Sequence, residues 1–144
     1  MALHHLALKQ AYPFLRTGGR ALSSIGGRVP LDTIIRLGRE NDYASEILTY
    51  TWKVQSEPEE VIGGYAKWER AGRGPFHFYP ASILADTFKS IAHVAAGDQA
   101  SKIEEALSLH ALSAQDALAA HRSQTLVGHT VVVLESIKHK ELLI

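Results

Sequence analysis

Residues 80–97 read PASILADTFKSIAHVAAG, and this stretch sets the expected fold. Its apolar residues recur three or four positions apart, which is the spacing of one buried helix face. The residues on this face are Leu84, Phe88, Ile91, Ala92 and Ala95. Proline is tolerated in the first turn of a helix, and Gly97 stands where a left-handed C-terminal cap belongs. The stretch therefore predicts an amphipathic helix.

Helix signals continue on both sides of this stretch. Downstream, Asp98 and Ser113 are N-cap residue types, and each precedes a segment with helical apolar spacing. Upstream, similar segments follow Pro30, Asn41-Asp42 and the capping-box spacing of Ser56–Glu59. We expect a mainly α protein of six or seven short helices in antiparallel hairpins, arranged as a bundle or a short α-solenoid.

The C-terminal region departs from this pattern. The β-branched residues at 130–134 could form a single short strand, since such residues are enriched in strands. A lone strand has no evident partner in an otherwise helical chain. The alternative is a C-terminal helix carrying Leu134, Ile137 and Leu142.

The charges are unevenly distributed although they sum to zero. Residues 1–30 contain four of the 15 basic residues and none of the 15 acidic ones, which leaves eleven basic and fifteen acidic residues elsewhere. An amphipathic, arginine-bearing segment without acids resembles a mitochondrial transit peptide. We therefore divide the chain into a basic N-terminal arm (1–29) and a single helical domain (30–144). A mitochondrial location is expected, on the matrix side or associated with the inner membrane.

Two features favour partner binding over catalysis. Arg16, Arg20 and Arg28 of the arm can meet acidic groups on another protein. The aromatic segment 76–79 lies in an expected loop and has a composition typical of protein interfaces. Its residues are Phe76, His77, Phe78 and Tyr79. We expect these seven residues to contact other protein subunits.

No catalytic, cofactor-binding or metal-binding residue is predicted. The chain has no cysteine, and none of its eight histidines forms an i, i+4 pair or an HExxH motif. No apolar run approaches the roughly 18 residues of a membrane-spanning helix, so no transmembrane segment is expected. A small enzyme is the third hypothesis, and it would need a pocket in which Asp86, His93, His110 or His121 converge.

A helical nucleic-acid-binding module is the second hypothesis. Lys67, Arg70 and Arg73 would then join the arginines of the arm, with nearby aromatic side chains for base stacking. The acidic remainder of the chain argues against this hypothesis, because strong nucleic-acid binders are usually basic overall.

One short stretch carries a family resemblance. Within residues 30–54, the run Arg39-Glu40-Asn41-Asp42-Tyr43-Ala44-Ser45 resembles the inter-helix turn of the matrix-side helical subunit of cytochrome c oxidase (subunit Va). It is also similar to the hairpins of tetratricopeptide-type and pentatricopeptide-type proteins. The resemblance implies a superhelix of short helices without catalytic residues of its own. The expected function is a non-catalytic accessory or structural subunit of a larger assembly. The favoured assembly is a mitochondrial respiratory or ATP synthase complex.

Overall fold

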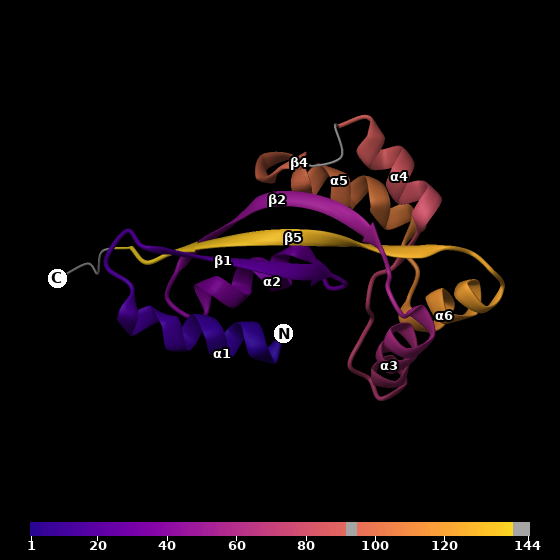
Figure 1. The fold of residues 1–144 in the computed structure, drawn as a ribbon, viewed down its shortest axis with the longest axis horizontal. Coiled ribbons are helices and arrows are strands. Elements are labelled where there is room, and N and C mark those ends of the chain that lie inside the picture. The colour runs from indigo at the N-terminus through magenta and orange to yellow at the C-terminus, as the bar shows by residue number, and fades with distance from the viewer. Residues whose placement is uncertain (92–94, 140–144) are drawn as a thin grey trace.

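An antiparallel β-sheet organises the chain, and helices pack against it (Figure 1). The computed structural model describes residues 1–91 and 95–139. The fold is α/β, so the expectation of a mainly α protein built from helical hairpins is wrong. Long strands form instead at residues 20–27, 44–54 and 127–137.

The described residues form a sheet of five strands in the order β1-β5-β2-β4, with β3 pairing to the start of β5. The strands are β1 (Arg20–Gly27), β2 (Ala44–Val54), β3 (Tyr79–Pro80), β4 (Ala95–Ala96) and β5 (Val127–Ile137). Every pair is antiparallel. Because the last strand lies between the first two, the sheet is complete only when the C-terminal part of the chain is in place.

The described part of the chain also contains six α-helices and three short 3-10 helices. The α-helices are α1 (Ala2–Ala11), α2 (Leu31–Arg39), α3 (Pro58–Arg70), α4 (Ala81–Lys89), α5 (Ala100–Leu107) and α6 (Ala114–Arg122). The 3-10 helices are η1 (Tyr12–Phe14), η2 (Gly97–Gln99) and η3 (Ser108–His110). Among these described helices, none has both the length and the apolar character needed to cross a membrane.

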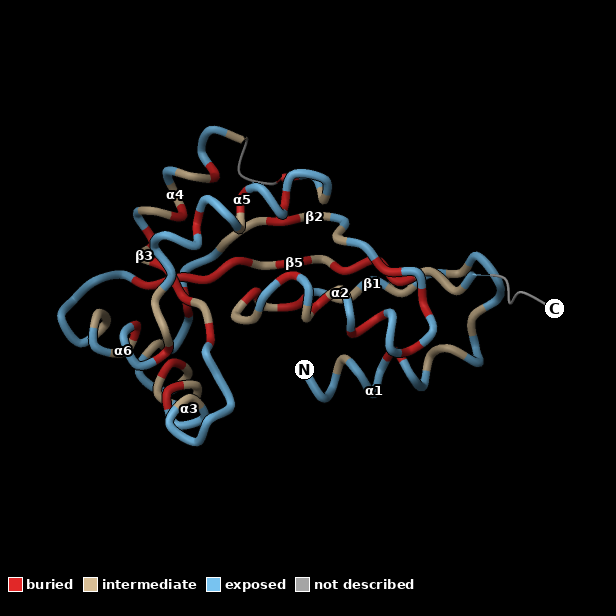
Figure 2. Tube along the Cα trace, turned by 180° about the vertical axis from the view of Figure 1, so that it is seen from behind, coloured by how far each residue is buried: buried red, intermediate tan, exposed pale blue. Residues whose placement is uncertain are grey.

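One face of the sheet carries the main core. Side chains of α1, α2, α4 and α5 pack there against buried residues of the strands. The buried strand residues of this face include Ile25, Tyr50, Val132 and Leu134. Figure 1 views the sheet from the opposite side, where no helix crosses in front of β1, β5 and β2. Figure 2 shows the molecule from behind and marks most of β5 as buried.

A second, smaller core lies at one end of the sheet. Helices α3 and α6 pack together there, at the lower right of Figure 1, around Ile62, Phe78, Ala117 and Val127. Val29, which follows β1, contacts both cores. This residue therefore marks the place where the α3–α6 pair meets the sheet.

Strand β2 replaces a helix expected after Asn41-Asp42. Its segment is rich in β-branched and aromatic residues, which favour strands. A β-bulge between Ile47 and Thr49 inserts one extra residue, so two core-facing residues, Ile47 and Tyr50, stand three positions apart. That spacing imitates one turn of a helix. The helical hairpin implied by the resemblance over residues 30–54 is therefore not formed.

Strand β5 is the central strand of the sheet. The single short strand considered at 130–134 is part of an 11-residue strand that pairs with both β1 and β2. The C-terminal helix considered for Leu134 and Ile137 is wrong, because both residues belong to β5. Leu142, which belongs to the same alternative, lies outside the described residues.

The predicted N-terminal arm is largely built into the fold. Residues 20–27, which belong to this arm, pair with β5 along their whole length. Leu8 of α1 is buried in the main core, and the Tyr43 hydroxyl donates to the Leu8 carbonyl oxygen at 2.6 Å. Lys138 Nζ donates to the carbonyl oxygens of Tyr12 and Leu15, at 2.9 Å each.

The helices expected from residues 80–122 are present as α4, α5 and α6. Ser113 caps α6 as expected, because its Oγ accepts a hydrogen bond from the Asp116 backbone N–H at 3.1 Å. Helix α4 ends at Lys89, before the expected cap at Gly97, and Ala92 lies outside the described residues. Local helix signals were thus reliable in this region, where no long strand intervenes.

Candidate partner-binding surface

The titratable residues considered for an enzyme do not converge. Asp86 lies on α4, His110 lies in η3, and His121 lies on α6. The Nε2 atom of half-buried His121 is 3.6 Å from a carboxylate oxygen of the exposed residue Glu59. His93 lies outside the described residues. Within residues 1–91 and 95–139, no group of three or more His, Asp and Glu side chains could hold a metal ion.

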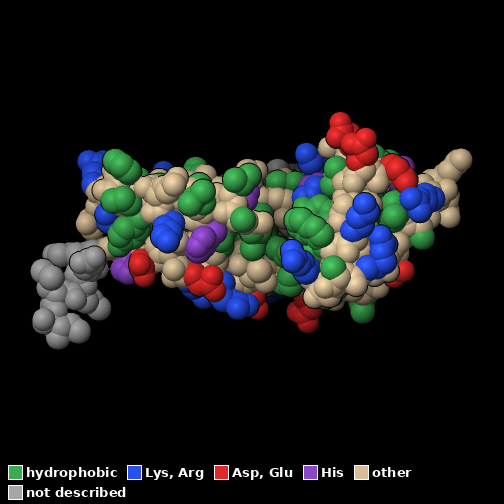
Figure 3. Space-filling model, turned by 90° about the horizontal axis from the view of Figure 1, so that it is seen from below, with side chains coloured by type: hydrophobic (Ala, Val, Ile, Leu, Met, Phe, Trp, Pro, Cys, Tyr) green, Lys and Arg blue, Asp and Glu red, His purple; other side chains and the backbone are tan. Residues whose placement is uncertain are grey.

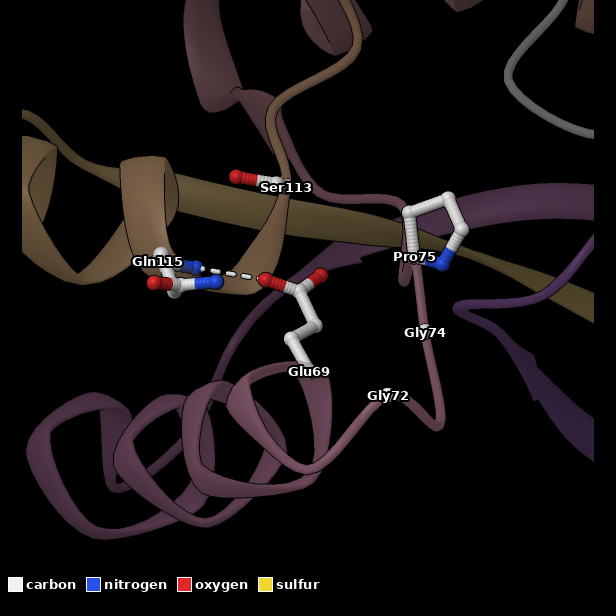
Figure 4. Close-up of a pocket in the computed structure, with 6 residues that line it drawn as sticks. All are labelled: Glu69, Gly72, Gly74, Pro75, Ser113 and Gln115. Carbon is white, nitrogen blue, oxygen red and sulfur yellow. Dashed lines mark hydrogen bonds between the residues drawn. The ribbon is translucent and has the colours of Figure 1, made fainter.

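A pocket of about 290 Å³ opens beside α3 and the start of α6 (Figure 4). Its acidic residue is Glu69, whose Oε2 accepts from the backbone N–H groups of Phe76 (2.8 Å) and Ala114 (2.7 Å). Its Oε1 accepts from the Gln115 N–H at 3.0 Å. Burial raises the pKa of Glu69, but these backbone donors outweigh burial and lower it. Glu69 therefore clamps α3 to α6 and is not poised as a proton donor.

The sheet face opposite the main core forms the candidate surface, which we call the open face. No described helix covers it along β1, β5 and β2 (Figure 1). Its floor consists of Leu22, Ser24, Thr49, Thr51, Val131 and Val133. Antiparallel sheets commonly leave one face to water, and that face is normally polar. Here the Leu22 side chain is 56% exposed and two valines are half-buried, so this face carries apolar surface.

Arg28 lies at the end of the open face nearest to α3, folded back over Gly26. Its Nε and Nη2 donate to Gln55 Oε1 at 3.1 and 2.7 Å. Its Nη2 also donates to His129 Nε2 at 3.1 Å. Gln55 and His129 are 4% and 1% exposed, so two buried neutral groups fix the position of the guanidinium.

His129 is held in its neutral form by this arrangement. Its Nε2 accepts from Arg28, so its Nδ1 carries the proton and donates to the Thr130 carbonyl oxygen at 2.8 Å. Burial, together with the positive charges of Arg28 and Lys53, lowers the pKa of His129 to about 4. The His129 ring therefore adds no positive charge to the open face at neutral pH.

Arg28 has no acidic partner within the described residues. The ion pairs there join Arg20 to Glu135 and join His121 and Arg122 to Glu59. Burial lowers the pKa of Arg28, and the neighbouring Tyr65 partly offsets this effect. A partly buried charge is normally compensated by an opposite charge, because taking it out of water is costly. Its uncompensated charge makes Arg28 the leading candidate for contact with an anionic group of another molecule.

Aromatic side chains of α3 continue the surface beyond Arg28. The guanidinium carbon of Arg28 lies 5.2 Å from the Tyr65 ring centroid, within range of a cation–π contact. The Tyr65 and Trp68 rings meet edge to face with centroids 5.9 Å apart, and Trp68 is 53% exposed. Together with Val61 and Gly64, these rings line a shallow pocket of about 260 Å³.

The three arginines predicted as partner-binding residues do not form one cluster. Arg16 is exposed in the turn between η1 and β1. Arg20 and Arg28 stand near opposite ends of β1, and Arg20 Nη1 is paired with Glu135 Oε2 at 2.8 Å. Only Arg28 is both partly buried and without a carboxylate partner among the described residues.

The aromatic segment predicted to contact a partner is mostly core. Phe76, Phe78 and Tyr79 are 7%, 0% and 2% exposed. Burial, helped by the charge of Glu104, raises the pKa of Tyr79 to about 12. His77 is half-buried, and its backbone N–H donates to the Arg28 carbonyl oxygen at 2.8 Å. The segment therefore supports the position of Arg28 from within the fold.

Sequence reasoning missed Gln55, Lys53 and His129. Their contribution depends on the β2–β5 pairing, in which Lys53 stands opposite His129. Recognising both segments as strands would have placed these residues on one face, because side chains alternate along a strand. No protein-family model matches the chain, and no curated protein matches it either.

Proposed function

We propose that the protein is a non-catalytic partner-binding protein and that the open face is its interface. The observation that carries this proposal is Arg28, a partly buried cation held by Gln55 and His129 without a carboxylate partner in the described part of the chain. Apolar side chains lie on the same uncovered face, with Val131 near Arg28 and Leu22 farther along β1. An apolar surface with an oriented arginine has the composition of a protein interface.

This role keeps the accessory function expected from the sequence and gives it a location on the molecule. Membership of a mitochondrial respiratory or ATP synthase complex stays a prediction, as does the location on the matrix side or at the inner membrane. The predicted location rests on the acid-free residues 1–29, and the predicted complex rests also on the resemblance over residues 30–54. The interface proposed here depends on neither.

A matched pair of variants tests the interface. Leu22→Glu places a charge on the open face, and Leu109→Glu places the same charge in η3, where Leu109 is 87% exposed. The full-length tagged protein is isolated from its own cells, and co-purifying proteins are quantified by mass spectrometry. We expect one or more partners to be lost with Leu22→Glu and retained with Leu109→Glu, while circular dichroism shows both variants folded. Equal recovery with both variants would contradict the proposal.

A second candidate is nucleic-acid binding through α3. Lys67 and Arg70 are exposed on α3, the helix that carries Trp68, and exposed Arg73 follows its end. Figure 3 shows Lys and Arg side chains gathered over this part of the molecule. An aromatic ring among cations can stack a nucleobase. Binding of a single-stranded oligonucleotide that weakens steeply with salt would favour this candidate. The zero net charge of the chain is the reason that we place it second.

A further inference from the structure

Two cations flank the neutral His129 ring at one end of the open face. Arg28 donates to the ring, and Lys53 stands opposite His129 in the β2–β5 register. Lys53 is exposed, whereas Arg28 is partly buried. Neither forms an ion pair within residues 1–91 and 95–139. An anionic group placed here would meet two positive charges, one of which is the preorganised guanidinium of Arg28.

We propose that Arg28 and Lys53 bind carboxylates of an extended acidic segment of the partner protein, and that this segment lies along the open face. The inference rests on the partner-binding function proposed above and names the chemistry of the partner. Charge-assisted hydrogen bonds from arginine to carboxylate are among the strongest polar contacts in proteins. Fixing the guanidinium in advance reduces the entropy lost on binding.

The charges of the open face determine which of its ends the acidic residues of the segment contact. Glu135 lies toward the far end, where Arg20 already compensates it. Glu46, which stands opposite Glu135, is exposed and adds a carboxylate without an ion pair among the described residues to that end. The acidic residues of the partner segment therefore belong at the Arg28 and Lys53 end, because they would be repelled at the Glu46 end.

The floor of the open face fits an extended chain. Ser24, Thr49 and Val131 are small or β-branched side chains on an antiparallel surface. An extended segment places alternate side chains toward such a floor and the others toward water. Leu22, farther along β1, offers apolar contact to such a segment beyond its acidic residues.

A protein segment fits this surface better than a nucleic acid does. The described floor residues of the open face include no aromatic side chain on which a base could stack. Glu46, an exposed carboxylate that forms no ion pair among the described residues, shares the face and would repel a phosphate backbone.

The test uses the full-length protein and defined probes. The probes are a labelled peptide of alternating Glu and Thr, the same peptide with Gln in place of Glu, and a single-stranded oligothymidylate of matched charge. Binding is measured by fluorescence anisotropy for the wild type, Lys53→Gln, Arg28→Gln and the control Arg36→Gln. Arg36 is an exposed arginine on α2, so its substitution removes the same charge from the helical side.

We expect the Glu peptide to bind and Lys53→Gln to weaken it about tenfold, as the loss of one charged contact implies. Arg28→Gln should weaken it at least as much, and Arg36→Gln should leave it within about twofold of the wild type. Lys53 is exposed, so its variant remains informative even where Arg28→Gln lowers stability. Equal binding of the Glu and Gln peptides, or no effect of Lys53→Gln, would overturn the inference. Tighter, Lys53-dependent binding of the oligothymidylate would also overturn it.

Failure of this inference can be told apart from failure of the proposed function. If Leu22→Glu removes the natural partner but the acidic peptide does not bind, the interface stands and the acidic character of the partner is wrong. If Leu22→Glu leaves the partner bound, the interface itself is wrong, and this inference falls with it.

Discussion

The His129 side chain is almost fully buried and accepts a hydrogen bond from an arginine, so its surroundings set its affinity for a proton. Protonation would place an N–H on Nε2, directly facing the Arg28 donor. The pKa of His129 is accordingly lowered to about 4, first by burial and then by the neighbouring charges. Because His129 is neutral, the positive charges at this end of the open face are those of Arg28 and Lys53.

We predict that His129 stays neutral at pH 5.5. The unfolded chain takes up this proton near pH 6.5 and the folded protein only near pH 4. Stability from this group is thus complete above pH 6.5 and decreases by up to about 3 kcal/mol as the pH falls to 4. NMR titration of the histidine Cε1 protons, assigned with His129→Asn, measures the midpoint directly. A His129 midpoint near 6.5 would contradict the description of this site.

Glu69 has a structural role, because its carboxylate accepts hydrogen bonds from three backbone N–H groups. Replacing Glu69 by Ala leaves three backbone N–H groups without their acceptor, so we expect a loss of about 2 kcal/mol in the free energy of unfolding. Because the pKa of Glu69 is lowered on folding, its contribution is present above its ordinary value of 4.5 and is lost in more acidic solution. Urea unfolding at pH 7 measures the loss. The control is Glu105→Ala, an exposed substitution on α5 that should change stability by less than about 0.5 kcal/mol.

Helix α2 rests on the sheet through a glycine. A Cβ at Gly38 would overlap the side chains of Ser45 and Ser136, which are joined by a 2.8 Å hydrogen bond. Gly38→Ala should therefore destabilise the protein by about 2 kcal/mol through overpacking. Gly63→Ala, on α3, meets no atom within 4 Å and should stabilise it by about 0.5 kcal/mol. Thermal unfolding of the two variants tests whether α2 lies this close to β2 and β5. A neutral Gly38→Ala would show that it does not.

The two faces of β5 can be compared with neighbouring valines. Val132 is fully buried in the main core, and Val133 is half-buried on the open face. Replacing Val132 by Thr buries a hydroxyl in apolar surroundings and should cost about 2 kcal/mol. The same change at Val133 should cost less than about 0.5 kcal/mol in the free protein, because the new hydroxyl can reach water. Equal costs in denaturant unfolding would mean that the open face is covered.

Elements with local signals were predictable from the sequence. The helices α4, α5 and α6 carry apolar spacing and cap residues within the segment itself, and Ser113 caps α6 as expected. The strands β1 and β5 depend on partners about a hundred residues apart, such as Ser24 and Val133. In β1, the glycine pair reads as a loop signal, although Gly27 is needed because Thr130 packs against its backbone.

The candidate site was predictable only in part for the same reason. Arg28 was identified from the charge of the N-terminal segment, which needs no structure. Its supports, Gln55 and His129, come from the ends of β2 and β5 and are brought together only by strand pairing. The aromatic segment beginning at Phe76 was misjudged because its neighbouring glycines and prolines suggested an exposed loop, whereas α3 and α6 enclose it.

At the scale of the whole molecule, the sheet divides the protein into two unlike sides. Helices α1, α2, α4 and α5 seal one side, and the α3–α6 pair closes one end (Figures 1 and 2). The other side keeps Leu22, Val131 and Val133 at a surface that also carries Arg28 and Lys53. Apolar surface beside an oriented charge is the arrangement from which the partner-binding role follows.

Hydroxyl-radical footprinting of the protein, free and in complex with the partner isolated from its cells, tests this role most directly. The method reports the solvent exposure of individual side chains, and Leu22 and Leu109 are both well exposed in the free protein. We predict that oxidation of Leu22 falls several-fold in the complex while oxidation of Leu109 is unchanged. Unchanged oxidation of Leu22 in a stable complex would show that the partner binds elsewhere and would contradict the account.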